Sequence, residues 1–351
     1  MTRRFRIGMA GAILASCVAA ACSTGCRRSE DPGEDSKAIK LLFSIALPPA
    51  HPQCVAAVNW AREIEKRAGD RVRIKVYPGG SLTRADFCFE GVIKGASDIG
   101  LSSFAETRER FPLLEGLDLP LGCPNGAIAT RVAHELAQKY KPKELRDVHL
   151  LYVHASGPSI LASRRPVRTL DDFKGLKVRA TGLAAQIVES LGATPVTLRS
   201  SETYEALAKG AVEATLGLTE TLKDLKQGEA IQYVVEAPAV GCTTAMFVVM
   251  NKHKWNKLPS DLQELFSKVS QEWVAKHGAA WDQAEQEART YLGELKRDLI
   301  TLPEAEQDRW KSAVRPVIDR YLRSTKEKGL PGDALLRDIQ AQIVKAASAG
   351  K

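Results

Sequence analysis

Hydrophobic and polar positions beyond the N-terminal region switch repeatedly between a period of two and a period near 3.6. Residues 72–77, VRIKVY, alternate apolar and charged side chains, which is typical of a half-buried strand. Residues 51–67 carry apolar side chains at steps of three and four, which predicts a helix. Two further strands, at 39–46 and 97–102, and a short helix at 84–94 complete the series. This order predicts an α/β layer with a parallel sheet, whose ligand-binding edge lies at the carboxyl ends of its strands.

The second half of the chain repeats this mixture of strands and helices. Residues 244–251, TAMFVVMN, form a continuous apolar run, which predicts a strand buried on both faces. The other predicted strands lie at 149–154, 159–163 and 177–180, and the predicted helices at 183–191 and 201–209. Because 351 residues exceed the usual size of one hydrophobic core, we expect two domains.

A long helix is predicted from Ser260 to about Leu295, because apolar residues recur there at steps of three and four. Ser260 and Gln263 have the spacing of a capping box. At 1.5 Å per residue the helix would measure about 50 Å, which is longer than one small domain needs. We therefore expect it to span two lobes. Two C-terminal helices are predicted at 304–324 and 333–347.

The N-terminus has the pattern of an export signal. A basic start is followed by an apolar segment at 7–21, and residues 27–37 then form a polar stretch. Cys17 ends a lipobox-like sequence and is our first candidate for acylation; Cys22 is the alternative, and a cleaved signal without lipid is the simpler interpretation. We assign residues 1–21 to the signal and 22–38 to a flexible tether, which together predict a periplasmic protein with a lipid anchor.

The charge distribution and the cysteine spacing argue against several classes of function. The net charge of +8 is dispersed among acidic residues, which argues against a nucleic-acid partner. No C-x-x-C spacing occurs, so we expect no metal and no cofactor. In an oxidising compartment Cys54 and Cys88 could form a disulfide, although the sequence leaves the pairing open. Motifs of hydrolases, phosphate-binding loops and zinc proteases are missing, so we do not expect an enzyme.

One cation stands out in residues 168–182, RTLDDFKGLKVRATG. Arg179 ends a predicted strand directly before a predicted helix, where backbone donors already favour an anion. A guanidinium at this position can bind both oxygens of a carboxylate. The alternative is a surface arginine that pairs with a nearby acid.

The segment DDFKGLKVRATG resembles the signature of the solute-binding proteins of tripartite ATP-independent periplasmic (TRAP) transporters. Other segments fit the same family in order, among them FPLLEGLDLPLG and VVMNKHKWNKLP, and the resemblance covers about residues 40–324. It implies a two-lobe periplasmic-binding-protein fold, type II-like, with hinge strands and a long helix crossing both lobes. We expect lobe I at 39–156 plus about 245–284, and lobe II at 157–244 plus about 285–348.

In that family the arginine of the G-L-K-x-R motif grips the substrate carboxylate, which the resemblance assigns to Arg179. It also implies a membrane permease driven by an ion gradient as partner. The residues Leu218 and Thr219 stand where many family members carry asparagine and proline, which puts the contacts to the distal end of the ligand in doubt.

Further ligand-binding candidates lie near predicted strand ends, where the α/β rule places ligands. Several have a structural alternative: His51 could cap a helix, His154 could be a buried core histidine, and Tyr204 could pack in the core. The full set of additional candidates is His51, Gln53, Phe104, His154, Gly157, Thr181, Tyr204, Leu218 and Thr219.

Together these patterns predict a binding protein for a small organic acid. Phe104 and Tyr204 favour a monocarboxylate with a hydrophobic or aromatic tail, since a dicarboxylate would need a second buried cation. A binding protein of an ATP-driven transporter and an exported enzyme that acts on organic acids remain the alternatives.

Overall fold

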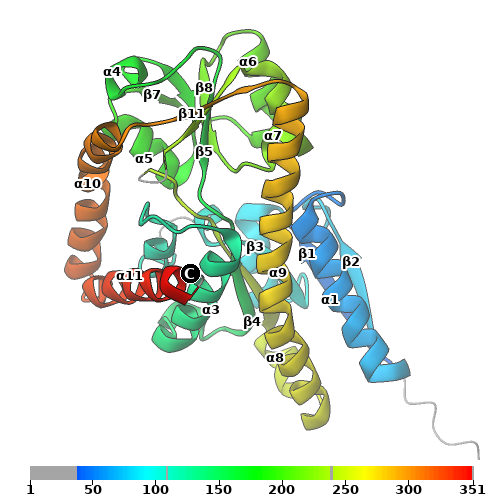
Figure 1. Ribbon diagram of the computed structural model, residues 1–351. Coiled ribbons are helices and arrows are strands. Elements are labelled where there is room, and N and C mark those ends of the chain that lie inside the picture. Colours follow the sequence, from blue (N-terminus) through cyan, green and yellow to red (C-terminus); the bar gives the residue numbers. More distant parts are fainter. Residues whose placement is uncertain (1–37, 108–109, 238–239, 350–351) are drawn as a thin grey trace, which may run out of the picture. The chain divides into compact units, whose positions relative to one another are not determined.

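The computed structural model describes residues 38–107, 110–237 and 240–349, which form two β-sheets with helices packed on them (Figure 1). The strands are β1 (Ile39–Ile45), β2 (Val72–Tyr77), β3 (Ile99–Ser103), β4 (Val148–Ala155), β5 (Ile160–Ser163), β6 (Lys177–Arg179), β7 (Thr194–Val196), β8 (Ala214–Gly217), β9 (Tyr233–Glu236), β10 (Ala245–Asn251) and β11 (Asp298–Thr301). The helices are α1 (Pro52–Ala68), α2 (Cys88–Ile93), α3 (Gly126–Tyr140), α4 (Leu170–Phe173), α5 (Gly182–Ser190), α6 (Thr203–Ala208), α7 (Thr221–Asp224), α8 (Lys252–Lys257), α9 (Ser260–Glu294), α10 (Glu304–Glu327) and α11 (Gly332–Ala349). The lipidation candidates Cys17 and Cys22 lie outside the described residues.

The first sheet has the strand order β2-β1-β3-β10-β4. β1 pairs in parallel with both β2 and β3, which confirms the predicted parallel sheet. β10 is antiparallel to both of its neighbours, β3 and β4, and all but its last residue is buried. The continuous apolar run at 244–251 is thus explained by a central strand that is covered on both faces.

The second sheet has the strand order β11-β9-β5-β8-β6-β7. β6 is parallel to β7 and to β8, whereas β5 is antiparallel to β8 and β9. The carboxyl ends of β6 and β8 therefore meet at one edge of this sheet. The two sheets with their helices confirm the predicted two-lobe α/β fold, and we call the sheet containing β1 lobe I and the sheet containing β6 lobe II.

Helices cover both faces of the lobe I sheet. On one face Trp60 of α1 packs edge-on against Phe43 of β1 and Phe266 of α9, with ring centroids 5.7 and 5.8 Å away. On the other face Phe89 of α2 packs against Phe247 of β10 at 5.3 Å. These edge-to-face aromatic pairs add specific geometry to apolar burial and hold the helices at the strand ends in place.

Helix α9 is 35 residues long and contacts both lobes, as predicted (Figure 1). It packs on α1, α3 and β4 of lobe I and then on α7 of lobe II. The predicted capping box is wrong. Pro259 occupies the N-cap and makes no side-chain cap, so Ser260 already lies inside the first turn. The side chain of Gln263 donates instead to the carbonyl oxygens of Trp255 and Leu258.

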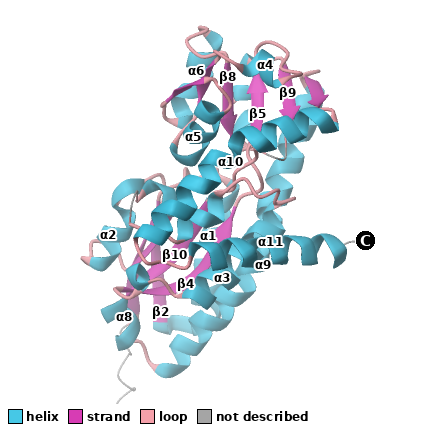
Figure 2. Cartoon of the chain, turned by 90° about the vertical axis from the view of Figure 1, so that its left-hand side faces the viewer, coloured by secondary structure: helices cyan, strands magenta, loops and turns pink. Residues whose placement is uncertain are grey.

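The C-terminal helices divide between the lobes. α10 packs on α4 and α5, whereas α11 packs on α3 of lobe I and on α10 (Figure 2). Leu335 and Ile339 bury their side chains in a cluster that contains Val132 and Leu136 of α3 as well as Trp310 of α10. The expected boundaries of the two lobes stay a prediction.

The predicted disulfide between Cys54 and Cys88 is wrong, because Cys54, Cys88, Cys123 and Cys242 are all free and buried. Cys54 belongs to the cluster with Ile99 and Leu101 on one face of the lobe I sheet. Cys88 approaches Gly100, which points to the opposite face. The sheet thus separates two sulfur atoms that a disulfide would need to place about 2 Å apart.

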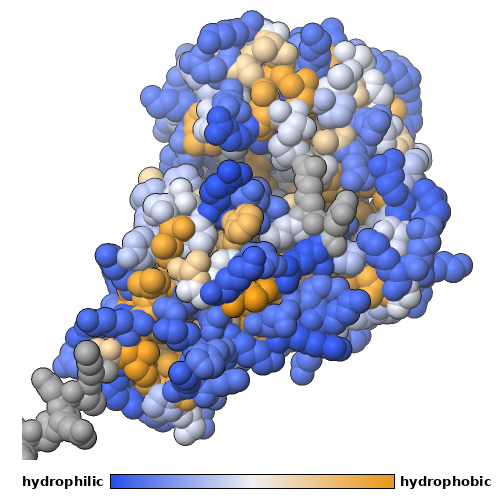
Figure 3. All heavy atoms as spheres, turned by 180° about the vertical axis from the view of Figure 1, so that it is seen from behind, coloured by the Kyte–Doolittle hydropathy of each residue, from blue (hydrophilic) through white to orange (hydrophobic). Residues whose placement is uncertain are grey.

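The face of the molecule seen in Figure 3 is mostly polar. On the face seen in Figure 3 the hydrophobic areas are small and lie among hydrophilic side chains. None of the helices in the described ranges combines the length and the apolar character needed to cross a membrane.

Candidate functional site

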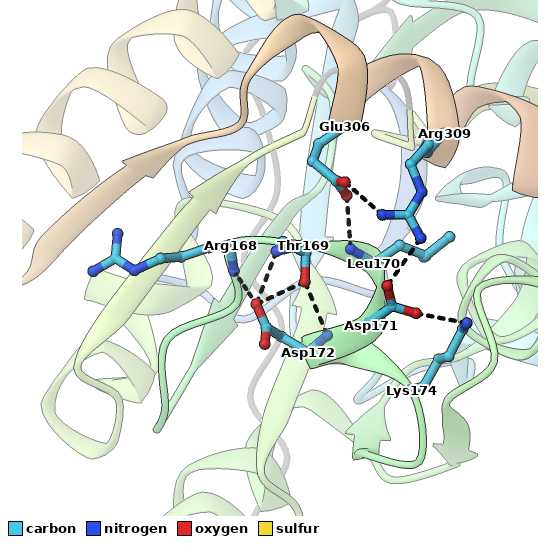
Figure 4. A network of polar contacts seen from close by, with 8 residues as sticks. All are labelled: Arg168, Thr169, Leu170, Asp171, Asp172, Lys174, Glu306 and Arg309. Atoms are coloured by element: carbon cyan, nitrogen blue, oxygen red, sulfur yellow. Dashed lines mark hydrogen bonds and ion pairs between the residues drawn. The ribbon is translucent and has the colours of Figure 1, made fainter.

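In the Arg168–Gly182 segment, the part that contains Asp171 and Asp172 has a structural role. Asp172 accepts from the backbone N–H groups of Arg168 and Thr169, while the Thr169 hydroxyl accepts from the N–H of Asp172 (Figure 4). This reciprocal capping box starts α4.

The same scaffold is tied to α10. Glu306 accepts from the backbone N–H of Leu170 at 2.9 Å, and Arg309 bridges Glu306 and Asp171 (Figure 4). These contacts hold α4 in place before the chain enters β6. They therefore support the position of Arg179 without touching it.

Arg179 is the last residue of β6, in register with Val196 of β7 and Thr215 of β8. Its Nε and Nη2 atoms both donate to the carbonyl oxygen of Leu198, at 3.1 and 3.0 Å. This contact occupies one edge of the planar guanidinium. The terminal edge, with the N–H groups of Nη1 and the second N–H of Nη2, remains available for a bidentate anion.

The charge of Arg179 is uncompensated within the described part of the chain, where no acidic side chain forms a salt bridge with it. The side chain is half-buried, and this burial lowers the pKa of the guanidinium. An arginine still remains protonated under all physiological conditions. A half-buried cation that forms no salt bridge among the described residues is a candidate site for an anionic ligand, so the surface ion-pair alternative is not supported.

The neighbouring strand β8 leaves space beside Arg179. A Cβ atom on Gly217 would lie 3.6 Å from Nη1 of Arg179 and 3.6 Å from the hydroxyl oxygen of Thr215. That hydroxyl is buried and has no hydrogen-bond partner among the described residues. Our sequence reasoning missed Thr215 and Gly217. The parallel pairing of β6 and β8, which brings them next to Arg179, could not be derived from local patterns.

From lobe I, the loop after β1 contributes His51. Its Nδ1 atom accepts from the backbone N–H of Gln53 at 3.2 Å and so caps α1, which is the alternative role considered for it. Its Nε2 atom faces Glu220 Oε1 at 3.9 Å. His51 also stacks edge-on against Trp281, with ring centroids 5.8 Å apart. The imidazole therefore has both a structural contact and a side that faces lobe II.

Gln53 and His154 belong to a buried polar network. The rings of His154 and His277 stack at 4.1 Å, and Nδ1 of His154 accepts from the indole N–H of Trp281. His277 contacts the side chains of Gln53 and Tyr152 at 2.6 and 3.1 Å. Burial lowers the pKa of both histidines, to about 3 for His277. The network supports the structural interpretation of His154 and Gln53.

Glu220 is the third residue that sequence reasoning missed. It follows β8 by three residues, is only 5% exposed, and its Oε1 atom finds no hydrogen-bond donor in the described chain. Burial raises the pKa of this carboxyl to about 8, and the nearby acids Asp224 and Glu285 add to the effect. No strand was predicted at 214–217, so the position of Glu220 just beyond the carboxyl end of a strand, at the ligand edge, could not be seen in the sequence.

Leu218 and Thr219 lie between Gly217 and Glu220. Leu218 packs against the hydrophobic cluster of lobe I, so this loop of lobe II contacts the other lobe. Thr219 is buried, and its carbonyl oxygen accepts from the N–H of Leu222. The loop therefore joins the two lobes beside the candidate site.

The remaining candidates differ in environment. Phe104 is 3% exposed and packs against Phe111 and Phe247, so the structure places it in the core and does not support a stacking role toward a ligand. Thr181 is exposed at the N-cap of α5, and Tyr204 is half-buried on α6. Gly157 lies close to Glu285 and Gly126, where a Cβ atom would come within 3.1 Å of the Glu285 carboxylate.

A separate groove of about 680 Å³ runs between α1 and α9, but none of the predicted ligand-binding residues lines it. Across the described residues, no group of three His, Cys, Asp or Glu side chains is arranged to hold a metal ion. The strand ends that carry Arg179, Glu220 and His51 are therefore the candidate ligand site.

Comparisons with known proteins identify the family of this chain. The family model of the bacterial extracellular solute-binding proteins, family 7, matches residues 43–325. A TRAP periplasmic solute-binding protein of Desulfovibrio salexigens is 33% identical, with a TM-score of 0.82 over 88% of this chain and 96% of that chain.

Two further similar proteins are described with different ligands. A TRAP periplasmic solute-binding protein of Bordetella bronchiseptica, solved with bound (R)- and (S)-mandelate, is 27% identical, with a TM-score of 0.80 over 88% of this chain and 99% of that chain. The C4-dicarboxylate-binding periplasmic protein DctP of Vibrio cholerae is 23% identical over 96% of this chain and 97% of its own length.

Proposed function

Because this chain belongs to family 7 of the bacterial extracellular solute-binding proteins, the binding proteins of TRAP transporters, we propose that it captures a small organic monocarboxylate in the periplasm. In this proposal the liganded protein delivers its acid to a TRAP permease driven by an ion gradient. Export by residues 1–21 and acylation of Cys17, or alternatively Cys22, are part of the same proposal.

The unpaired terminal edge of Arg179 is the observation that carries the proposal. Two of its nitrogens are held by Leu198 O, so the fork is oriented before a ligand arrives. A hydrogen bond to a charged group contributes about 1.5–3 kcal/mol. A bidentate carboxylate could therefore supply a large share of the roughly 8 kcal/mol that a micromolar site requires.

The charges around the site favour one carboxylate over two. Beyond Gly217 the nearest ionisable side chain of the loop is Glu220, which has the acids Asp224 and Glu285 as neighbours. A second carboxylate on the ligand would meet these acids without a compensating cation. The mandelate-bound relative, 27% identical to this chain, supports an aromatic monocarboxylate as the first class to test.

Lobe closure would couple binding to delivery. We assign lobe I to 39–156 plus about 245–284 and lobe II to 157–244 plus about 285–348. A carboxylate on Arg179 that is buried by His51 and Trp281 of lobe I would shift an open–closed equilibrium by its higher affinity for the closed form. The permease would then recognise the closed form.

A thermal-shift screen of the purified protein against organic acids tests the proposal. A ligand present at 100 times its Kd should stabilise the protein by about 2.7 kcal/mol. We expect aromatic monocarboxylates such as mandelate to raise Tm, and the matched neutral amide, mandelamide, to leave it unchanged. A panel of mono- and dicarboxylates without any shift, or equal shifts for acids and amides, would contradict the proposal.

A further inference from the structure

The strand next to Arg179 carries a buried hydroxyl that makes no hydrogen bond. Arg179 of β6 and Thr215 of β8 are register partners in a parallel pair, so their side chains leave the same face of the lobe II sheet. Thr215 is 2% exposed, and its Oγ1 atom has no hydrogen-bond partner among the described residues. A hydroxyl buried in this way costs free energy, because it gives up its hydrogen bonds to water and gains none.

Gly217 lies two residues further along β8, on the same face as Thr215. A Cβ atom here would lie 3.6 Å from Nη1 of Arg179 and 3.6 Å from Oγ1 of Thr215, which are ordinary van der Waals distances. The φ angle of Gly217 is also outside the left-handed region. Neither packing nor backbone conformation therefore requires glycine at this position, although glycine weakens a strand.

The missing side chain leaves a space between the cation and the hydroxyl. Nη1 belongs to the free edge of the Arg179 guanidinium, since Nε and Nη2 already donate to the carbonyl oxygen of Leu198. This free edge and the Thr215 hydroxyl both approach the point where a side chain of residue 217 would begin. Gly217 itself is half-buried, so the space is not sealed within the core.

A carboxylate matches the two groups that flank this space. Its two oxygens offer about four acceptor positions, and a bidentate contact with an arginine uses one on each oxygen. The other positions need donors when the ligand is buried. The Thr215 hydroxyl can donate to one of them, whereas an ammonium group in the same space would be repelled by Arg179.

We infer that Thr215 and Gly217 complete the carboxylate site. Oγ1 of Thr215 donates a third hydrogen bond to the carboxylate that Arg179 holds, and the missing side chain of Gly217 makes room for that carboxylate. This inference rests on the proposed function. It also explains why the unliganded protein retains a hydroxyl without a partner and a glycine within a strand, both of which lower its stability.

Two variants should therefore gain stability and lose affinity together. Thr215→Val removes the hydroxyl and keeps the shape, so the Tm of the unliganded protein should rise by about 2 °C while Kd rises at least about tenfold. Gly217→Ala should preserve or raise Tm and also weaken binding about tenfold, because its methyl group occupies the space. Thr215→Ser, which retains the hydroxyl, should bind within about threefold of the wild type.

Titration calorimetry with mandelate, benzoate and the other acids found in the screen measures Kd, and scanning calorimetry measures Tm. The loss in Thr215→Val should agree within about threefold among the acids, because the hydroxyl contacts the carboxylate that they share. Thr325→Val is the matched control. Thr325 is 1% exposed, but its hydroxyl donates to the carbonyl oxygens of Tyr321 and Leu322, so this variant should lower Tm and keep the affinity. Gly293→Ala, where a Cβ meets nothing within 4 Å, should raise Tm without changing the affinity.

The outcomes separate this inference from the proposed function. If no carboxylate binds the wild type, the proposed function fails and the inference fails with it. If carboxylates bind but Thr215→Val or Gly217→Ala keeps the wild-type affinity, the proposed function stands and the inference is overturned. A loss of affinity for one acid alone would overturn it too, because Thr215 would then contact the tail of that acid. So would a lower Tm of unliganded Thr215→Val, since the hydroxyl would then already have a partner.

Discussion

The guanidinium of Arg179 is held against the carbonyl oxygen of Leu198 by two hydrogen bonds, from Nε at 3.1 Å and from Nη2 at 3.0 Å. Leu198 lies in the loop that follows β7, and β7 pairs in parallel with β6. The strand pairing thus supplies a fixed acceptor for one edge of the guanidinium. The other edge is thereby oriented before a carboxylate binds, which reduces the entropy lost on binding.

Replacement of Arg179 by alanine should weaken carboxylate binding at least about thirtyfold, or about 2 kcal/mol, because charge-assisted hydrogen bonds are lost. Arg179→Lys should recover only part of the affinity, since an ammonium cannot form the bidentate contact. Titration calorimetry with the best acid from the screen measures both. Arg199→Ala is the control, because Arg199 is exposed and pairs with Glu202. Unchanged affinity in Arg179→Ala would refute the assigned role.

Two glycines of α9 should respond in opposite directions to the same change. A Cβ on Gly278 would lie 2.9 Å from the backbone Cα of Ala127 in α3, whereas a Cβ on Gly293 would meet nothing within 4 Å. Gly278→Ala should therefore destabilise the protein by about 1–3 kcal/mol through overpacking. Gly293→Ala, in the last turn of α9, should stabilise it by up to about 1 kcal/mol, since alanine loses less backbone entropy than glycine on forming a helix. Urea unfolding gives both values; destabilisation by both variants to the same extent would contradict the close α3–α9 packing.

The buried histidine network should make stability depend on pH. Burial lowers the pKa of His277 to about 3, below the value near 6.5 of an unfolded histidine. Between these values the unfolded chain binds a proton that the folded protein excludes, so the stabilising contribution of neutral His277 is lost as pH falls. The destabilisation caused by His277→Gln should therefore be largest near pH 7 and shrink toward pH 4.

Urea unfolding at several pH values measures this trend, with a limiting slope of about 1.4 kcal/mol per pH unit for one proton. His253→Gln serves as the control, because His253 is exposed on α8. A destabilisation by His277→Gln that is the same at pH 7 and pH 4 would mean that the ring is not held neutral.

Asp118 should show the opposite dependence. Its Oδ1 atom accepts from the N–H of Ala245 at 2.7 Å, and burial raises the pKa of the carboxyl to about 8. The folded protein therefore holds a proton that the unfolded chain releases above about pH 4, so this stabilisation is lost as pH rises from about 4 to about 8. Asp118→Asn keeps the acceptor but has no proton to lose.

The stability of Asp118→Asn relative to the wild type should thus increase from pH 5 to pH 8 in urea unfolding experiments. Asp86→Asn, a change at an exposed carboxylate, should show no such trend. If the asparagine variant gained nothing at pH 8, the buried carboxyl would have to be ionised at little cost.

Arg179, the main residue of the candidate site, could be predicted because the segment that positions it is continuous in the sequence. The residues from Arg168 to Gly182 contain the capping box, the strand β6 and the N-terminus of α5, each of which depends on neighbours in the sequence. Phe104 shows where such reasoning fails. Its position after β3 suggested a ligand contact, but its ring is enclosed by Phe111 of the following loop and by Phe247 of the distant strand β10.

The residues that were missed share one cause. Thr215, Gly217 and Glu220 gain their importance from the pairing of β8 with β6 and from the approach of the β8 loop to His51. The disulfide prediction failed for a related reason, since Cys54 and Cys88 lie on opposite faces of a sheet that β10 completes from far along the chain.

The amino-acid sequence by itself determined the α/β class, the long helix, the family resemblance and the cation at the end of β6. These depend on the periods of apolar residues, on caps and on one contiguous motif, all of which act over a few neighbouring residues. Only the tertiary structure decided which edge of Arg179 is free, which acid faces His51, and which aromatic rings belong to the core. Such relationships arise between strands that are distant in sequence, because sheet pairing and burial, and not local preference, place those side chains together.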